Sequence, residues 1–122
     1  MPDVEANSIH ITAFDNIEAR EIIANALEGY PVHYMDGRIV RYQWEKYYVS
    51  CNIKADWEEF MKTLEGDFSE LTCGEKCLWA VNSQLSSKLI ADTIRLVKNR
   101  TPNAFEKANI MGVVEIKREK WN

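Results

Sequence analysis

The sequence predicts an α+β domain in which helices pack on a largely antiparallel sheet. Short runs of alternating apolar and polar residues, which are typical of strands, occur near both ends of the chain and in its middle. Segments with apolar residues at helical spacing separate these runs, without an internal repeat, a low-complexity tract or a linker. In chain order, the expected elements are β-α-β-β-β-α-β-α-β, with a central β-meander packed by two to three helices.

The first expected elements are a strand over 8–14 and a helix that begins after Asp15. Glu18 follows Asp15 by three residues, which is the spacing of a capping box. Apolar residues of this helix recur at the i, i+3, i+4, i+7 and i+8 positions of one face, and Gly29 is expected to end it. We therefore expect one apolar stripe of the helix to lie on the sheet.

The segment 31–53 predicts the three-stranded meander. Asp36-Gly37 is a pair that two-residue type I′ turns prefer, because both positions of such a turn need a positive φ angle. Glu45-Lys46 separates the two strand-like runs that follow. Turns at these two places fix the register of all three strands.

With these turns, strands over 38–44 and 47–53 follow the first one, and side chains alternate between two faces. One face is mainly apolar and is expected to be core: His33, Met35, Val40, Tyr42, Trp44, Tyr47, Val49, Cys51 and Ile53. The other is more polar and is expected to be exposed: Val32, Tyr34, Ile39, Arg41, Gln43, Tyr48, Ser50 and Asn52. Tyrosine and arginine supply contact area and directional hydrogen bonds together, so this face predicts a contact surface. Ordinary cross-strand pairs in a half-covered sheet account for the same pattern.

Signals for a second helix and a further strand follow the meander. Asp56 and Glu59 form a second capping box, and Gly66 supplies the expected end of that helix. A strand is expected within 71–81, and residues 74–76 allow a small hairpin there.

The last third of the chain predicts one long helix and a closing strand. The helix is expected over 87–99, with the serine pair at its start as a cap and a broad apolar face. A Thr-Pro pair at the start of 101–108 is typical of an N-cap followed by proline, and predicts a short turn or helix there. The run 110–117 is expected to be a strand. Residues 1–122 therefore predict a single domain, with residues 1–7 flexible.

Composition limits the class of protein. The chain has 122 residues, a net charge of −4, 46% hydrophobic residues and 28% charged residues, which is typical of a soluble globular domain. It contains no apolar run near the roughly 18 residues of a membrane span, and its first residues lack a signal-peptide pattern. We therefore expect a cytoplasmic protein without membrane association.

Charge is distributed unevenly along the chain. Residues 1–72 carry 14 acidic and 6 basic residues, whereas residues 73–122 carry 5 acidic and 9 basic residues. A sequence pI of about 5.2 argues against general affinity for nucleic acid. The basic C-terminal third still leaves open an accessory subunit of a nucleoprotein assembly, although cations near a helix C-terminus also serve the helix itself.

The cysteines and histidines offer little for a metal or redox site. Cys73 and Cys77 could meet across a hairpin as a redox pair, but two reduced structural thiols in a cytosolic protein are the favoured interpretation. Zinc knuckles use two intervening residues and four ligands, and the remaining candidates are Cys51, His10 and His33. The predicted register holds His33 and Cys51 too far apart to share a metal ion. We therefore expect neither a metal nor a cofactor.

Catalytic motifs are missing from the sequence. It contains no nucleophile elbow, phosphate-binding glycine loop, metal-binding histidine pair or dinucleotide fingerprint. His10, Asp15 and His33 could approach one another if the first strand lies beside the meander, but structural hydrogen bonds explain two histidines more simply. The sequence leans against an enzyme without deciding the question.

The pattern favours a small cytosolic binding protein that acts by occlusion, as an inhibitor, immunity protein or regulatory subunit. Its predicted site is the face with Tyr34, Arg41, Gln43 and Tyr48, and the acidic N-terminal half is suited to steer a basic protein partner. The alternative is a protein that binds or sequesters a small planar, nucleotide-like anion, stacked on a tyrosine and held by Arg38 or Arg41. Homo-oligomer formation stays open in either case.

Overall fold

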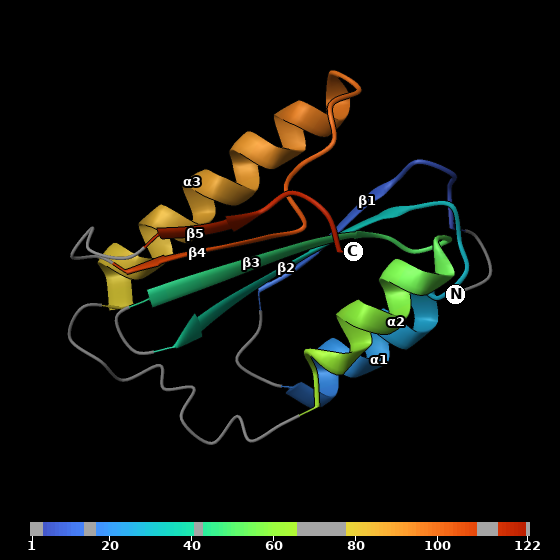
Figure 1. Ribbon diagram of the computed structural model, residues 1–122, viewed down its shortest axis with the longest axis horizontal. Helices are drawn as coiled ribbons and strands as arrows, with labels where there is room; N and C mark the ends of the chain where they lie inside the picture. Colours follow the sequence, from blue (N-terminus) through green and yellow to red (C-terminus); the bar gives the residue numbers. More distant parts are fainter. Residues whose placement is uncertain (1–3, 14–16, 41–42, 66–77, 110–114, 122) are drawn as a thin grey trace.

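The computed structural model describes residues 4–13, 17–40, 43–65, 78–109 and 115–121. This part of the chain forms one α+β domain with a five-stranded, mostly antiparallel sheet and three helices (Figure 1). The strands are β1 (Ile9–Thr12), β2 (His33–Val40), β3 (Gln43–Ser50), β4 (Phe105–Asn109) and β5 (Glu115–Arg118). The helices are α1 (Ile17–Leu27), α2 (Lys54–Lys62) and α3 (Leu78–Val97). The predicted fold class is therefore confirmed.

The strands lie in the order β1-β2-β3-β4-β5, so β1 and β5 form the two edges of the sheet. β1 runs parallel to β2, and α1 connects them, as a parallel connection requires. The other three neighbouring pairs are antiparallel. None of the described helices has both the length and the apolarity needed to span a membrane.

Helices cover both faces of the sheet, with α1 and α2 on one side and α3 on the other (Figure 1). Neighbouring residues of a strand point to opposite faces, so Tyr34 and Met35 belong to different cores. The core under α1 and α2 contains Leu27, Tyr34 and Phe60, and the core under α3 contains Met35 and Leu85.

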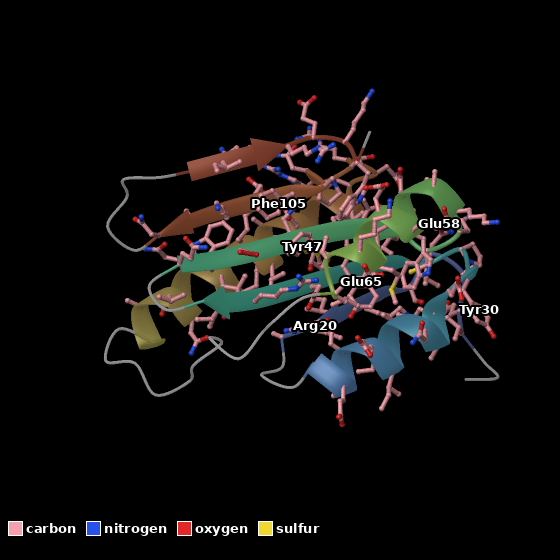
Figure 2. The ribbon with its side chains drawn as sticks, turned by 60° about the horizontal axis from the view of Figure 1, so that its bottom comes forward. Arg20, Tyr30, Tyr47, Glu58, Glu65 and Phe105 are labelled. Atoms are coloured by element: carbon pink, nitrogen blue, oxygen red, sulfur yellow. The ribbon has the colours of Figure 1, made fainter. Side chains whose placement is uncertain are left out.

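Aromatic rings extend the first core across the sheet. Tyr47 on β3 and Phe105 on β4 are register partners whose ring centroids lie 5.0 Å apart (Figure 2). Trp121, three residues after the end of β5, stacks on Tyr47 at 6.1 Å and also contacts Phe60. The segment that follows β5 is thereby tied to α2.

The predicted hairpin at Asp36-Gly37 is wrong. Both residues lie inside β2, and β2 and β3 pair from His33 with Ser50 to Val40 with Gln43, which puts the connection at 41–42, outside the described residues. Glu45-Lys46 likewise lies inside β3 and makes no turn. The predicted meander is instead one long hairpin whose second strand pairs with β4.

The helices also differ from the prediction at their ends. α1 agrees with the predicted helix, and Gly29, two residues beyond it, has a φ of 82°. Asp15 and Gly66 lie outside the described residues. α2 begins earlier than expected, because Trp57 already donates its backbone N–H to the carbonyl of Ile53, and Asp56 lies in the first turn instead of capping it.

The C-terminal third differs most. Residues 78–81, expected in a strand, are the first turn of α3, while 71–77 lie outside the described residues. The expected helix over 101–108 is wrong from Phe105 onward, because β4 pairs with β3 there. The closing strand is confirmed at 115–117, and residues 110–114 lie outside the described part.

Candidate functional site

The face predicted to bind a partner does not exist as predicted. Tyr34 pairs with Val49 in the actual register, so Tyr34 and Tyr48 point to opposite faces of the sheet. Tyr34 is 0% exposed and Arg38 is 3% exposed, which places both in the interior. Gln43 is half-buried, and Arg41 lies outside the described residues. The error comes from the turn predicted at Asp36-Gly37. When a turn moves, the pairing register changes, and with it the face of the sheet to which each later side chain belongs.

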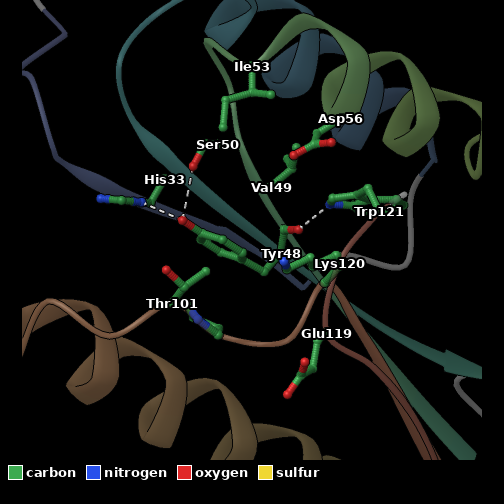
Figure 3. Close-up of a pocket in the computed structure, with 12 residues that line it drawn as sticks. His33, Tyr48, Val49, Ser50, Ile53, Asp56, Thr101, Glu119, Lys120 and Trp121 are labelled. Carbon is green, nitrogen blue, oxygen red and sulfur yellow. Dashed lines mark hydrogen bonds between the residues drawn. The ribbon is translucent and has the colours of Figure 1, made fainter.

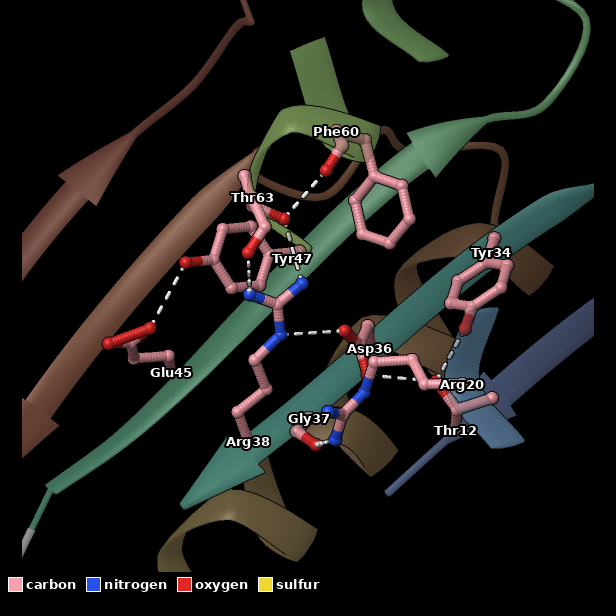
Figure 4. A network of polar contacts seen from close by, with 10 residues as sticks. All are labelled: Thr12, Arg20, Tyr34, Asp36, Gly37, Arg38, Glu45, Tyr47, Phe60 and Thr63. Carbon is pink, nitrogen blue, oxygen red and sulfur yellow. Dashed lines mark hydrogen bonds and ion pairs between the residues drawn. The ribbon is translucent and has the colours of Figure 1, made fainter. Parts of the chain in front are cut away.

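Arg38 is part of an interior polar network (Figure 4). Its Nε donates to Asp36 Oδ2 at 2.8 Å, while Nη1 and Nη2 donate to the backbone and side-chain oxygens of Thr63 at 3.0 and 2.7 Å. Its guanidinium lies 4.1 Å from the centroid of the Tyr47 ring. Arg20 from α1 binds the other Asp36 oxygen at 2.7 Å. These contacts join β2 to α1 and α2, so Arg38 serves the fold and is not turned toward a ligand.

A cavity of about 400 Å³ opens at the end of the sheet where β2 begins and β3 ends (Figure 3). Its walls come from five places in the chain: the start of β2, the end of β3, the start of α2, the loop before β4 and the residues after β5. The apolar part of the lining is Val49, Ile53, Pro102, Ala104 and Trp121. The charged part is Asp56, Glu119 and Lys120.

A chain of neutral polar side chains lines one wall of the cavity. The Tyr48 hydroxyl lies 2.8 Å from His33 Nδ1 and 3.1 Å from Ser50 Oγ (Figure 3). Burial lowers the pKa of His33 and raises the pKa of Tyr48, so both side chains are uncharged at neutral pH. The rings of His33 and Tyr48 are also stacked, with centroids 5.9 Å apart. This wall therefore offers hydrogen-bond donors and acceptors without a formal charge.

Backbone contacts hold the walls of the cavity against one another. The indole N–H of Trp121 donates to the carbonyl of Tyr48 at 2.7 Å, and the N–H of Tyr48 donates to the carbonyl of Ala104 at 2.9 Å. The N–H of Ala104 in turn donates to the carbonyl of Glu119 at 3.1 Å. Strand β3 thus positions both the loop before β4 and the segment after β5, so the cavity is already formed without a ligand.

Sequence reasoning found this site only in part. Tyr48 is among the predicted binding residues, whereas His33 is predicted to face the core and is a candidate only for metal binding and catalysis. The sequence gives no signal for Trp121, because nothing around it links it to a residue 73 positions earlier. The bond that joins the two residues is set by the packing of β3 against the chain beyond β5.

Among the residues that the structure describes, those considered for metal binding and catalysis do not gather at one place. His10 on β1 pairs with Tyr34, and His33 on β2 pairs with Ile9. The two histidines therefore point to opposite faces of the sheet, and they do not form the catalytic group that the sequence left open. In the described part of the chain, no three His, Cys, Asp or Glu side chains gather as a metal site requires. Burial raises the pKa of the Cys51 thiol to about 12, which makes it a poor nucleophile. Cys73 and Cys77 lie outside the described residues, so their pairing stays a prediction.

Comparison with known proteins adds no assignment. No protein-family model matches this chain, and a search of curated proteins found no match in sequence. The functional argument therefore starts from the geometry of the cavity.

Proposed function

We propose that this protein binds a small, uncharged hydrogen-bonding molecule in the cavity at the end of the sheet. The observation that carries the proposal is the Tyr48 hydroxyl, which lies in the cavity wall between His33 and Ser50. Ligand sites are concave and mostly apolar, with a few placed polar groups, and commonly measure roughly 300–1,000 Å³. A cavity of about 400 Å³ falls in that range, and its lining combines five apolar residues with the polar wall around Tyr48 and three charged residues.

The charges around the cavity favour an uncharged ligand over the planar anion considered from the sequence. The formally charged lining residues are two acids, Asp56 and Glu119, and one base, Lys120. Arg38, the expected anion contact, is held in the interior by Asp36 and Thr63. An anion in the cavity therefore meets more negative than positive charge.

Two fragments of similar shape test the proposal: benzamide, which is neutral, and benzoate, which is an anion. Binding is followed by two-dimensional NMR through the indole N–H of Trp121, which reports from the cavity wall and is assigned with Trp121→Phe. We expect benzamide to shift this resonance and benzoate to shift it less at the same concentration. Tyr48→Phe removes one hydroxyl, so it should weaken benzamide binding by about 3- to 10-fold.

Tyr34→Phe is the matched control. It also removes a buried tyrosine hydroxyl, which lies 2.6 Å from Thr12 Oγ1. Tyr34 belongs to the core under α1 and α2 and does not line the cavity, so this variant should leave benzamide affinity unchanged. If neither fragment shifts the Trp121 resonance, or if the two tyrosine variants bind benzamide alike, the proposed site is wrong.

Occlusion of a protein partner, as an inhibitor, immunity protein or regulatory subunit, stays a prediction. Such a partner would have to use a surface other than the predicted one, because Tyr34 and Tyr48 are both buried and point to opposite faces of the sheet. An accessory role in a nucleoprotein assembly also stays a prediction, and its test is retention of nucleic acid at low salt.

A further inference from the structure

His33 and Tyr48 share a hydrogen bond whose direction decides what the cavity wall offers to a ligand. The bond joins His33 Nδ1 and the Tyr48 hydroxyl at 2.8 Å, and the same hydroxyl lies 3.1 Å from Ser50 Oγ (Figure 3). A hydroxyl has one hydrogen and two lone pairs. The neighbour that accepts this hydrogen therefore determines whether Tyr48 presents a hydrogen or a lone pair to the rest of the cavity.

Neutral His33 accepts the hydrogen of Tyr48. One ring nitrogen of a neutral imidazole is a donor and the other is an acceptor. The acceptor nitrogen is the most basic atom among these three side chains, because it alone takes up a proton near neutral pH. The imidazole hydrogen is then on Nε2, at the other end of the ring from the bond to Tyr48 (Figure 3). Tyr48 donates to Nδ1, and its oxygen keeps a lone pair for Ser50 or for a ligand.

Protonation of His33 reverses this hydrogen bond. Both ring nitrogens of an imidazolium are donors, so Nδ1 then donates to the Tyr48 oxygen. The hydrogen of Tyr48 must turn to Ser50 or to a ligand. The same wall of the cavity thus changes from a hydrogen-bond acceptor to a donor, and only hydrogens have to move.

The surroundings keep His33 neutral until the solution is acidic. β1 faces His33 with Ile9, which is apolar, and the loop before β4 supplies uncharged lining residues. The charged side chains on the cavity walls come from α2 and from the residues after β5: Asp56, Glu119 and Lys120. Burial lowers the pKa of His33 below its ordinary value of 6.5. The acceptor form of the wall is therefore the one present at neutral pH.

We propose that the proton on His33 determines which hydrogen-bonding molecules the cavity selects. When His33 is neutral, the cavity selects a ligand that donates to Tyr48, such as a primary amide. When His33 is protonated, the cavity also accepts a ligand that can only receive a hydrogen bond, such as a ketone. This inference rests on the proposed function and adds the hydrogen-bonding polarity of its ligand. His33 is a positioning residue in this scheme, because it acts on the ligand through Tyr48.

Benzamide and acetophenone test the inference. They have similar shapes and no charge, but only benzamide has an N–H group to donate. Their affinities are measured through the indole resonance of Trp121 at pH values above and below the His33 pKa, which an NMR titration of the ring supplies. Above that pKa we expect benzamide to bind about 3- to 10-fold more tightly than acetophenone, and below it we expect this ratio to fall toward one. Because both fragments are measured on the same protein, general effects of pH on the fold cancel in the ratio.

Two histidine variants locate the effect. His33→Gln cannot titrate, so its preference between the two fragments should be the same at every pH. His10→Gln is the matched control, since His10 lies 2.8 Å from Ser8 Oγ and points to the opposite face of the sheet. It should keep the full pH dependence, and circular dichroism should show both variants folded. A further measurement needs neither variant nor ligand: nitrogen NMR of the unmodified protein should find the hydrogen of neutral His33 on Nε2.

Three outcomes would overturn this inference while benzamide still binds, and they leave the proposed function intact. The ratio of affinities could stay constant through the His33 pKa. Folded His33→Gln could keep the pH dependence. Nitrogen NMR could find the hydrogen of the neutral ring on Nδ1. If neither fragment shifts the Trp121 resonance at any pH, the proposed function and this inference fail together.

Discussion

Lys46 on β3 and Asp92 on α3 form an ion pair inside the protein, with Nζ 2.8 Å from Oδ2 and both side chains 0% exposed. The same Nζ lies 3.3 Å from Glu106 on β4, and Lys88 of α3 approaches Glu106 to 2.6 Å. Burial by itself would raise the pKa of Glu106, but the hydrogen bond from Lys88 and the charge of Lys46 lower it. Lys46 and Lys88 thus face two buried carboxylates between the sheet and α3, and Arg95 lies 3.8 Å from Asp92 at the exposed side of this cluster.

Removing Lys46 should destabilise the protein strongly. Lys46→Met leaves Asp92 and Glu106 buried with one nearby lysine fewer, and breaking a buried pair in this way costs about 3–5 kcal/mol. Urea unfolding at neutral pH measures the loss. The control is Lys54→Met, which removes an exposed cation 4.0 Å from Glu58 and should change the free energy of unfolding by less than about 0.5 kcal/mol.

The double variant Lys46→Met/Asp92→Leu separates pairing from packing. It removes one cation and one anion together, so it should be more stable than the sum of the two single changes predicts. A double variant whose loss equals that sum would show that Lys46 and Asp92 are not energetically coupled.

A second prediction concerns Asp36, which binds both Arg20 and Arg38 in the other core (Figure 4). Asp36→Asn keeps the size of the side chain but removes the negative charge between two buried guanidiniums, so we expect a loss of about 3–5 kcal/mol in the free energy of unfolding. Thr12→Val removes only the hydroxyl that donates to Asp36 at 2.8 Å, and should cost about 1 kcal/mol. Equal losses for the two variants in chemical denaturation would contradict an electrostatic role for Asp36.

The fold class and helix α1 could be predicted because their signals are local. The capping and apolar spacing that predicted α1 lie within the helix or next to it. The turn at Asp36-Gly37 had an equally clear local signal, yet it was wrong, because both residues serve distant contacts. Asp36 binds Arg20, and Gly37 leaves room for Leu85 of α3. Neither requirement is visible in the residues around the pair.

The site is harder to predict than the fold for the same reason. Tyr48 was identified by its amphipathic side chain, but its role depends on His33 across the hairpin and on Trp121 at the far end of the chain. Lys46 is likewise assigned to a turn from the sequence, because Glu45-Lys46 separates two strand-like runs. Its partners Asp92 and Glu106 come from α3 and β4, and only the folded chain brings them together.

The close approach of Gly37 and Leu85 leads to a third prediction. A Cβ atom added at Gly37 would lie 3.0 Å from Leu85 Cδ2 and 3.2 Å from Cδ1, so Gly37→Ala requires the leucine to move. We expect a loss of about 1–3 kcal/mol in thermal or chemical unfolding. Shortening the leucine in Gly37→Ala/Leu85→Val should recover part of that loss.

Gly29→Ala is the control for this pair. Nothing lies within 4 Å of a Cβ at Gly29, but its φ of 82° strains any other residue by about 1 kcal/mol. Leu85→Val should therefore not rescue Gly29→Ala. If it rescues both glycine variants equally, the effect at Gly37 does not come from contact with Leu85.

The fourth prediction follows from the burial of His33 in the cavity wall. Burial lowers the pKa of His33 in the folded protein below its ordinary value of 6.5, so the unfolded chain binds more protons just below that pH. The stability contributed by neutral His33 is therefore complete above pH 6.5 and declines as the pH falls toward the folded pKa. His33→Gln lacks this contribution. His10 is present in both proteins, so its contribution cancels when their stabilities are compared. The advantage of the unmodified protein over His33→Gln in urea unfolding should be constant above about pH 7 and shrink as the pH falls below 6.5. An NMR titration that gives His33 a pKa above 6.5 would reverse the sign of this effect and contradict its burial in the wall.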